Sequence, residues 1–248
     1  MTTPSHPPIT AYAVWSPTGQ SIAYVANNDL YIIPSAATAS ESPIRVTSNG
    51  NASLFNGVPD WVYEEEVFSS DFALWWSPDS TKVAFLHLDE TLVEEFTYPI
   101  YNPTQDSNAV IPYPDHVTMR YPKPGYHNPI VSLHVFELDR YRDALSKGED
   151  DAEKHTIELD WTGKHADENR IVFEVVWAED TELIIKEVDR AGEDGHVVYF
   201  DLAVDSLDAR VNGKVVRRLG KHGEEGDDGW IESVSSPLWG GTHGMRAF

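Results

Sequence analysis

Three consecutive carboxylates, Glu64 to Glu66, carry the clearest chemical signal in this 248-residue sequence. They lie inside the segment 60–68, DWVYEEEVF, where aromatic and aliphatic residues precede and follow them. Adjacent ionised carboxylates repel one another and resist desolvation, so an apolar frame around them favours a site that receives a cation. The alternative is an acidic turn that faces the solvent, because runs of charge usually face water.

The residues around the carboxylates predict a short helix that holds them in place. Asp60 is a suitable N-cap, and a helix from there brings Trp61 close to Phe68 on one face and Tyr63 close to Val67. Such a helix anchors the carboxylates between two apolar contacts.

Glu65 and Glu66 are the candidate binding residues. An ammonium group has three donors and a full positive charge, and two converging carboxylates can satisfy most of it with charge-assisted hydrogen bonds. Burial decides the strength of this site: contacts in a desolvated cavity contribute a few kcal/mol, and exposed ones roughly 0 to 1 kcal/mol.

The composition excludes several classes of function. A net charge of −23 argues against nucleic acid or an anionic membrane surface as partner. The absence of cysteine excludes disulfides, thiolate metal sites and a cysteine nucleophile. The ten histidines are scattered, and pairs such as His155 with His165 lie in polar loop sequence, so we expect no metal site and no cofactor.

Common catalytic and targeting motifs are missing as well. The sequence has no Gly-x-Ser-x-Gly elbow, Walker A loop, dinucleotide fingerprint or His-Glu-x-x-His motif. It shows no signal peptide, and no stretch approaches the ~18 apolar residues that span a bilayer. Asn51 begins the tripeptide Asn-Ala-Ser, a glycosylation sequon that has meaning only in the secretory pathway.

An internal repeat defines the fold class. The segment 14–25 has a Trp, a Ser-Pro turn and a strand rich in β-formers, and the same order recurs at 75–86 and, in degenerate form, at 176–185. Repeated hairpins with a Trp before the turn are typical of β-propeller blades or of a β-sandwich, and we favour the propeller. Each repeated Trp is then expected to pack between blades.

The remaining segments are less regular. The Pro-rich stretches 98–103 and 121–129 cannot be central strands, so they are expected as ordered loops or edge pieces. Residues 131–138 return to a strand, and 146–154 predict an exposed loop. Residues 197–202 and 211–219 predict two strands joined by a type I′ turn at Asn212-Gly213, and 221–229 a solvated loop.

The order of these motifs resembles the propeller domain of the dipeptidyl peptidase IV family, most closely its fungal dipeptidyl aminopeptidase B branch. The resemblance is carried by segment 60–68 with the following Ala-Leu-Trp-Trp-Ser-Pro, and also by 28–31, 121–125 and 128–129. It runs from about Trp15 to about Glu232. The family consists of serine exopeptidases that remove N-terminal dipeptides with Pro or Ala in second position, and its members are often homodimers. By this resemblance Glu65 and Glu66 bind the α-ammonium of the peptide.

The resemblance implies an all-β fold with about three to four four-stranded blades of an eight-bladed propeller, plus the helical turn with the glutamates. We expect a disordered segment at 1–14, a partial propeller at 15–236 and a tail without resemblance at 237–248. The family's membrane anchor, early blades and a substrate-orienting arginine should precede Trp15, and its hydrolase domain should follow Trp230. The sequence therefore looks like a fragment without a catalytic triad, whose relatives reside at the vacuolar membrane or in the secretory pathway.

Two functions follow from these observations. The first is the substrate-recognition part of a dipeptidyl aminopeptidase, inactive by itself. The second is a non-catalytic propeller that serves as a protein-interaction module, with the three glutamates as acidic surface.

Overall fold

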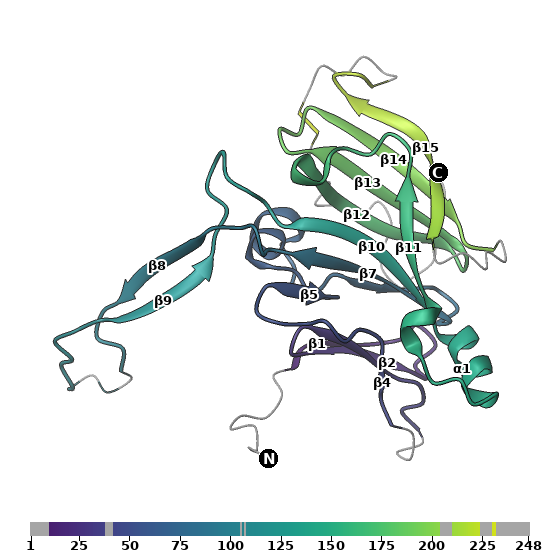
Figure 1. The fold of residues 1–248 in the computed structure, drawn as a ribbon, viewed down its shortest axis with the longest axis horizontal. Helices are drawn as coiled ribbons and strands as arrows, with labels where there is room; N and C mark the ends of the chain where they lie inside the picture. Colours follow the sequence, from purple (N-terminus) through teal and green to yellow (C-terminus); the bar gives the residue numbers. More distant parts are fainter. Residues whose placement is uncertain are drawn as a thin grey trace.

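The computed structural model of the protein describes residues 10–37, 42–104, 106, 108–203, 210–223 and 230–231. These residues form mostly β-strands (Figure 1). The strands are β1 (Thr10–Trp15), β2 (Ile22–Ala26), β3 (Asp29–Ile33), β4 (Ile44–Arg45), β5 (Leu54–Asn56), β6 (Leu74–Trp76), β7 (Lys82–Asp89), β8 (Glu95–Ile100), β9 (Asp115–Arg120), β10 (Ile130–Glu137), β11 (Thr156–Trp161), β12 (Arg170–Glu179), β13 (Glu182–Asp189), β14 (Asp194–Asp201) and β15 (Arg210–Gly220). The helical elements are η1 (Tyr63–Phe68), α1 (Leu138–Ser146), η2 (Ala152–His155) and η3 (Asp167–Asn169).

The strands group into three four-stranded antiparallel units, which we call blades. The first blade is β1 to β4, the second is β6, β7, β10 and β11, and the third is β12 to β15. Parallel pairing of β11 with β15 joins the second and third blades into one larger sheet, and β5 pairs with the end of β7. The predicted all-β, partial propeller fold is confirmed.

The Ser-Pro turns of the first two blades have the same geometry. The backbone amide of Ser16 donates to the carbonyl of Ser21 at 2.8 Å, and that of Ser77 donates to the carbonyl of Lys82 at 2.9 Å. The serine hydroxyl of each turn also accepts a backbone amide, at 3.1 and 2.9 Å respectively. The repeat found in the sequence is therefore a repeated hairpin.

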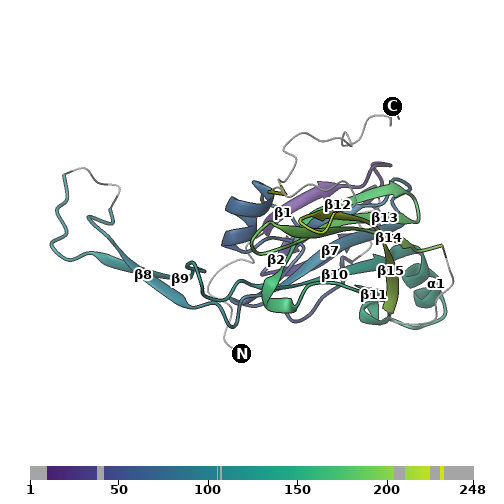
Figure 2. The ribbon, with the colours of Figure 1, turned by 90° about the horizontal axis from the view of Figure 1, so that it is seen from above.

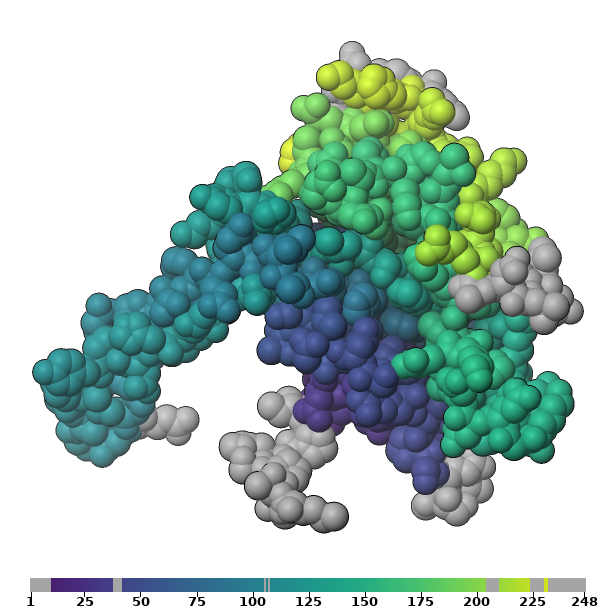
Figure 3. All heavy atoms as spheres, viewed as in Figure 1, coloured from purple at the N-terminus to yellow at the C-terminus, as the bar shows by residue number. Residues whose placement is uncertain are grey.

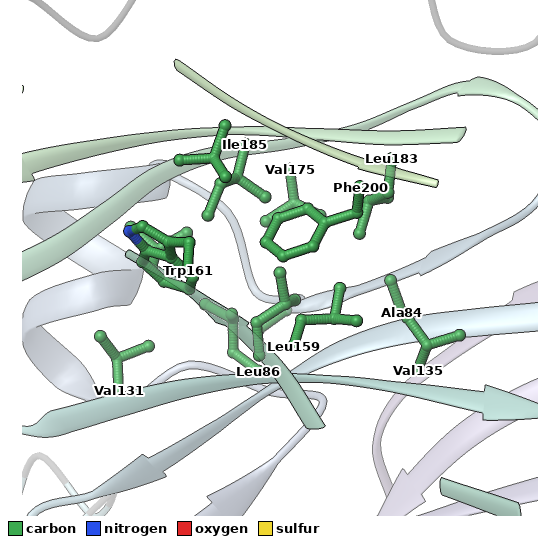
Figure 4. Close-up of a cluster of buried hydrophobic side chains, with 14 of the residues drawn as sticks. Ala84, Leu86, Val131, Val135, Leu159, Trp161, Val175, Leu183, Ile185 and Phe200 are labelled. Carbon is green, nitrogen blue, oxygen red and sulfur yellow. The ribbon is translucent and has the colours of Figure 1, made fainter. Parts of the chain in front are cut away.

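The blades pack face to face because their strands alternate. On β7, Val83 and Phe85 belong to the core shared with the first blade, while Ala84, Leu86 and Leu88 belong to the core shared with the third. Figure 4 shows side chains of the second core, from β7, β10, β11, β13 and β14 among others, directed toward one another. Strand β7 thus serves two cores.

The repeated tryptophans do not all pack in the same way. Trp76 and Trp177 are buried, and the Trp177 indole N–H donates to the carbonyl of Trp75 at 3.0 Å, which ties β12 to β6. Trp15 is 57% exposed, so the prediction of packing between blades is wrong for this residue.

The strands β8 and β9 form a two-stranded arm inserted between β7 and β10. The arm extends away from the body of the molecule in every view (Figures 1, 2 and 3). The first Pro-rich stretch lies here, with Pro99 on β8 opposite His116. It is not part of a central sheet, as the sequence predicted.

Several local expectations differ from the structure. Strand β1 begins at Thr10, so residues 10–14 belong to the first blade and not to a disordered segment that ends at 14. Helix α1 replaces the end of the predicted strand 131–138 and the start of the predicted loop. Residues 237–248 lie outside the described part of the chain, as do 224–229.

The predicted turn at Asn212-Gly213 is wrong. Both residues lie within β15, where Asn212 pairs with Asp160 and Gly213 with Trp161 of β11. A Cβ atom on Gly213 would approach the Phe200 ring to 2.5 Å, so close packing between β14 and β15 requires the glycine.

Candidate functional site

The glutamates lie on a helical turn that begins at Trp61 and continues as the π-helix η1. The Asp60 carboxylate accepts the backbone amides of Val62 at 3.3 Å and Tyr63 at 3.2 Å, and its carbonyl accepts the amide of Glu64 at 2.9 Å. Asp60 thus caps the turn, as predicted, and satisfies amides that a helix start leaves unpaired.

The opposite face of this turn is fixed in the core. Tyr63 is 1% exposed, and its ring meets the edge of the Phe68 ring at 5.4 Å. Phe68 in turn meets Trp75 at 5.8 Å. An α-helical spacing predicts Val67 beside Tyr63, whereas the wider π-helix brings Phe68, five positions after Tyr63, into ring contact.

All three glutamates point away from this anchor and are exposed. The structure therefore brings Glu65 and Glu66 together on one surface turn, and Glu64 stands beside them. No salt bridge among the described residues neutralises them. A strong ammonium site would need these carboxylates in a desolvated cavity, whereas here they are exposed. In this setting each contact to an ammonium contributes about 0 to 1 kcal/mol.

Two further carboxylates are buried near this turn. Asp60 is 2% exposed and Glu90 is 6% exposed. Burial raises the pKa of Asp60 to about 6. Burial, followed by the charge of Asp60, raises the pKa of Glu90 to about 7. The negative charge beneath the turn therefore changes in the physiological pH range.

A cavity of about 420 Å³ opens at the base of the arm next to the motif. Its lining is Ala52, Ser53, Phe55, Trp61, Glu90, Glu95, Thr118, Met119 and Arg120. The Trp61 ring lies 4.6 Å from that of Tyr121, and the Arg120 Nε donates to Ser53 Oγ at 3.1 Å. Sequence reasoning missed this cavity because its walls come from segments that only the folded arm brings together.

Asn51 is exposed on the loop before β5. Its Oδ1 accepts the amide of Ser53 at 2.8 Å and its Nδ2 donates to the carbonyl of Asn49 at 3.1 Å. The sequon thus forms a compact surface turn.

A second group of titratable side chains lies in the third blade. His165, Glu187 and His196 place potential ligand atoms within 4.8 Å of one another. Burial alone would raise the pKa of Glu187, but hydrogen bonds from His165 and Trp161, together with the nearby His196 ring, outweigh it and hold this pKa at about 2. The pair His155 with His165 is not the pair that the fold brings together, and no spacing along the chain indicates the pairing of His165 with His196.

Blades of four antiparallel strands that pack face to face, with a capped glutamate turn against their core, define a partial β-propeller. The sequence pattern of the dipeptidyl peptidase IV (DPP IV) N-terminal region matches residues 1–244, and the chain belongs to this family. The match extends past both ends of the range 15–232 that the sequence motifs cover. It also includes residues 237–244, which belong to the stretch expected to be a tail without resemblance.

Curated relatives agree with this assignment. The chain is 38% identical over 224 residues to a probable dipeptidyl-aminopeptidase B of Podospora anserina, and equally to one of Chaetomium globosum. Each alignment covers 89% of this chain and 22% of the relative, so the chain spans less than a quarter of their length.

Solved structures show the same fold. The structure of Porphyromonas gingivalis dipeptidyl peptidase 4 matches with a TM-score of 0.62 and 25% identity, over 86% of this chain and 27% of that one. A putative dipeptidyl aminopeptidase IV of Bacteroides ovatus matches with a TM-score of 0.55 and 17% identity, over 82% and 23% of the two chains, which is a likeness of fold. Among the described residues no helix has the length and apolar character needed to cross a membrane.

Proposed function

We propose that this chain is the substrate-recognition part of a serine-type dipeptidyl aminopeptidase, in which Glu65 and Glu66 bind the α-ammonium of the peptide substrate. The observation that carries the proposal is the pair of adjacent, exposed carboxylates on a turn fixed by the Asp60 cap and by buried Tyr63. The family relationship supports a peptide ligand.

The chemistry of the pair fits a free peptide N-terminus. An ammonium group donates in three directions and carries a positive charge. It can therefore pair with both carboxylates, which have no salt bridge among the described residues. A clamp on this group measures a fixed distance along the substrate, which would account for release of dipeptides. Any preference for Pro or Ala in second position would come from other groups of the enzyme. Because the carboxylates are exposed here, we expect weak binding by this chain and tighter binding where a complete enzyme excludes water.

Binding of a dipeptide tests the proposal directly. Ala-Pro with a free amine and N-acetyl-Ala-Pro are titrated into the full chain at low salt, with amide chemical shifts as readout. We expect shifts around 61–68 for the free amine only, and loss of these shifts in Glu65→Gln and Glu66→Gln. Glu64→Gln is the matched control, since it removes the same charge from the same turn. Equal response to both peptides, or equal loss in all three variants, would sink the proposal.

Catalysis is expected to need residues outside this stretch of chain. The sequence contains no Gly-x-Ser-x-Gly elbow that could supply the nucleophile. The chain by itself should therefore release no chromophore from an Ala-Pro anilide. Hydrolysis that survives removal of contaminating proteases would contradict this expectation.

The arm favours a second candidate function, a protein-interaction module that forms homodimers. Its strands expose large apolar side chains, Phe96, Tyr98 and Ile100 on β8, and Tyr113 precedes β9. Exposed aromatic patches commonly mark interfaces. We expect sedimentation velocity to show a concentration-dependent dimer that Phe96→Ser with Tyr98→Ser abolishes. A monomer at all concentrations would count against this candidate.

A further inference from the structure

Three side chains with metal-binding groups, His165, Glu187 and His196, meet at one end of the third blade, and Asp194 lies beside His165. Glu187 on β13 and His196 on β14 are directly opposite each other in the strand register. Asp194 begins β14, and His165 reaches them from the loop between β11 and η3. Glu187 is fully buried, while the side chains of His165 and His196 are 13% and 12% exposed. The group is enclosed yet touches the solvent.

The tautomer of His165 follows from its partner. Its Nδ1 lies 2.9 Å from Glu187 Oε1, which also accepts the His165 backbone amide at 2.6 Å. An ionised carboxylate only accepts, so the Nδ1 atom carries the proton and donates. The Nε2 atom of this ring is then directed toward the Asp194 carboxylate, with 3.6 Å between Nε2 and Oδ2.

Two polar atoms in the group have no hydrogen-bond partner although they are buried: His196 Nδ1 and Asp194 Oδ1. The nearest carboxylate oxygen to His196 Nδ1 is Glu187 Oε2, at 3.5 Å. Buried polar atoms without partners are costly, and each requires a reason such as an ion that satisfies them.

The distances have a simple explanation in coordination chemistry. Separations of 3.5 and 3.6 Å are long for a charge-assisted hydrogen bond, which measures about 2.7 to 2.9 Å. They are close to the edge of a tetrahedron around a zinc ion with bonds of about 2.0 to 2.1 Å, which is about 3.4 Å. We propose that His165, His196 and Glu187, whose ligand atoms lie within 4.8 Å of one another, bind a divalent transition metal, with Zn²⁺ preferred and Asp194 beside His165.

The donor set selects the class of metal. Two imidazole nitrogens with carboxylate oxygens suit Zn²⁺, whereas Mg²⁺ and Ca²⁺ prefer oxygen ligands alone. Neighbouring groups support such a site. Glu187 Oε1 orients the His165 ring, and the Trp161 indole N–H donates to Glu187 Oε2 at 2.7 Å. Hydrogen bonds of this kind orient the ligands of known metal sites.

A metal here would have a structural role. It would cross-link the loop 162–166 and the β13–β14 hairpin of the third blade. Both segments are far along the chain from the glutamate turn. Because the metal binds the folded chain, it would stabilise the fold by mass action. The proposal is independent of the function proposed for Glu65 and Glu66.

The test uses the full chain after removal of metals with a chelator. We expect it to bind one equivalent of Zn²⁺, seen by competition with a chromophoric chelator, and to melt at a higher temperature with Zn²⁺ than with Mg²⁺. His196→Gln should lower Zn²⁺ affinity at least about 10- to 100-fold. His116→Gln is the matched control, because His116 is an exposed histidine on the distant arm. Equal affinity in the two variants would overturn the proposal.

Co²⁺ provides a second measurement that needs no variant. Tetrahedral Co²⁺ bound to nitrogen and oxygen ligands absorbs visible light much more strongly than the hydrated ion, so the wild-type chain should develop these bands with one equivalent. If neither Zn²⁺ nor Co²⁺ binds, the metal site is refuted. The group is then stabilised by a protonated His165 ring that lies between the Glu187 and Asp194 carboxylates.

Discussion

The hydroxyl of Tyr63 accepts a hydrogen bond from the backbone amide of Val172 at 3.2 Å, which ties the glutamate turn to the third blade. Val172 lies where the pairing of β12 with β13 shifts register, so Tyr63 satisfies an amide at an irregular point of the ladder. The position of Glu65 and Glu66 thus depends on a contact between segments that are far apart in the sequence.

Tyr63→Phe should destabilise the chain by about 1 to 3 kcal/mol, because it leaves the buried Val172 amide without its acceptor. The ring contact with Phe68 is kept in this variant. Urea unfolding measures the loss, and Tyr101→Phe, at a residue 78% exposed, should change nothing. A stable Tyr63→Phe chain would show that this hydrogen bond does not position the turn.

Asp60 should tolerate Asn better than Ala. Asp60 accepts the Tyr63 amide through Oδ1 and the Val62 amide through Oδ2, so Asn keeps an acceptor for one of them, whereas Ala leaves both unpaired and should cost about 0.5 to 2 kcal/mol. Thermal unfolding of the two variants separates capping from charge. If Asn is as damaging as Ala, the carboxylate charge and not the cap holds the turn.

Glu90 makes stability depend on pH. Its folded pKa of about 7 is above the unfolded value of 4.5. The contribution of protonated Glu90 to the free energy of unfolding is therefore fully present below the unfolded pKa and is lost as the pH rises through 7. Glu90→Gln removes the buried charge. Relative to wild type, this variant should gain stability from pH 5 to pH 7 and level off at a gain of about 2 to 3 kcal/mol.

Denaturant unfolding at several pH values checks the Glu90 prediction. The Glu149→Gln variant serves as control, because it removes one carboxylate from an exposed position. Asp60, also with a raised pKa, contributes in the same direction, so a smaller effect is expected from Asp60→Asn. A Glu90→Gln variant that differs from wild type equally at all pH values would contradict the raised pKa.

Asn51 should be glycosylated when the chain is made in the secretory pathway, because its side chain is exposed on a surface turn. Mass spectrometry before and after glycosidase treatment measures the modification. Ser53→Ala should abolish it by removing the sequon and leaving Asn51 in place. An unmodified Asn51 would show that this turn or its neighbour Arg120, which bonds Ser53, blocks the transferase.

The fold was predictable where the signals are local and repeated. The Ser-Pro turns place the same hydrogen bonds at Ser16 and Ser77, and strand alternation predicts which side chains are buried. The candidate glutamates were also recognisable, since they are contiguous. The cavity at Glu90 was not, because it depends on where the arm folds back.

Features that depend on contacts between strands could not be predicted from the sequence. Glu187 and His196 are opposite each other only through the register of β13 and β14, and His165 joins them from another loop. Nothing in their spacing along the chain predicts a cluster. The π-helix at Tyr63 is a similar case, because its buried tyrosine contacts Val172 of β12, which is far along the chain and is not indicated by helix propensity.

Gly213 shows how packing can override a turn signal. Asn-Gly usually marks a hairpin, but here both residues lie inside β15 and the glycine allows close contact with Phe200 of β14. Gly213→Ala should therefore destabilise the chain by about 1 to 3 kcal/mol, since the new methyl group meets an aromatic ring that cannot move away. The double variant Gly213→Ala with Phe200→Leu should recover part of this loss relative to Phe200→Leu alone, because the smaller side chain leaves room. If Gly213→Ala were neutral, the close approach of Phe200 would not require the glycine. Calorimetric melting of the three variants distinguishes these outcomes.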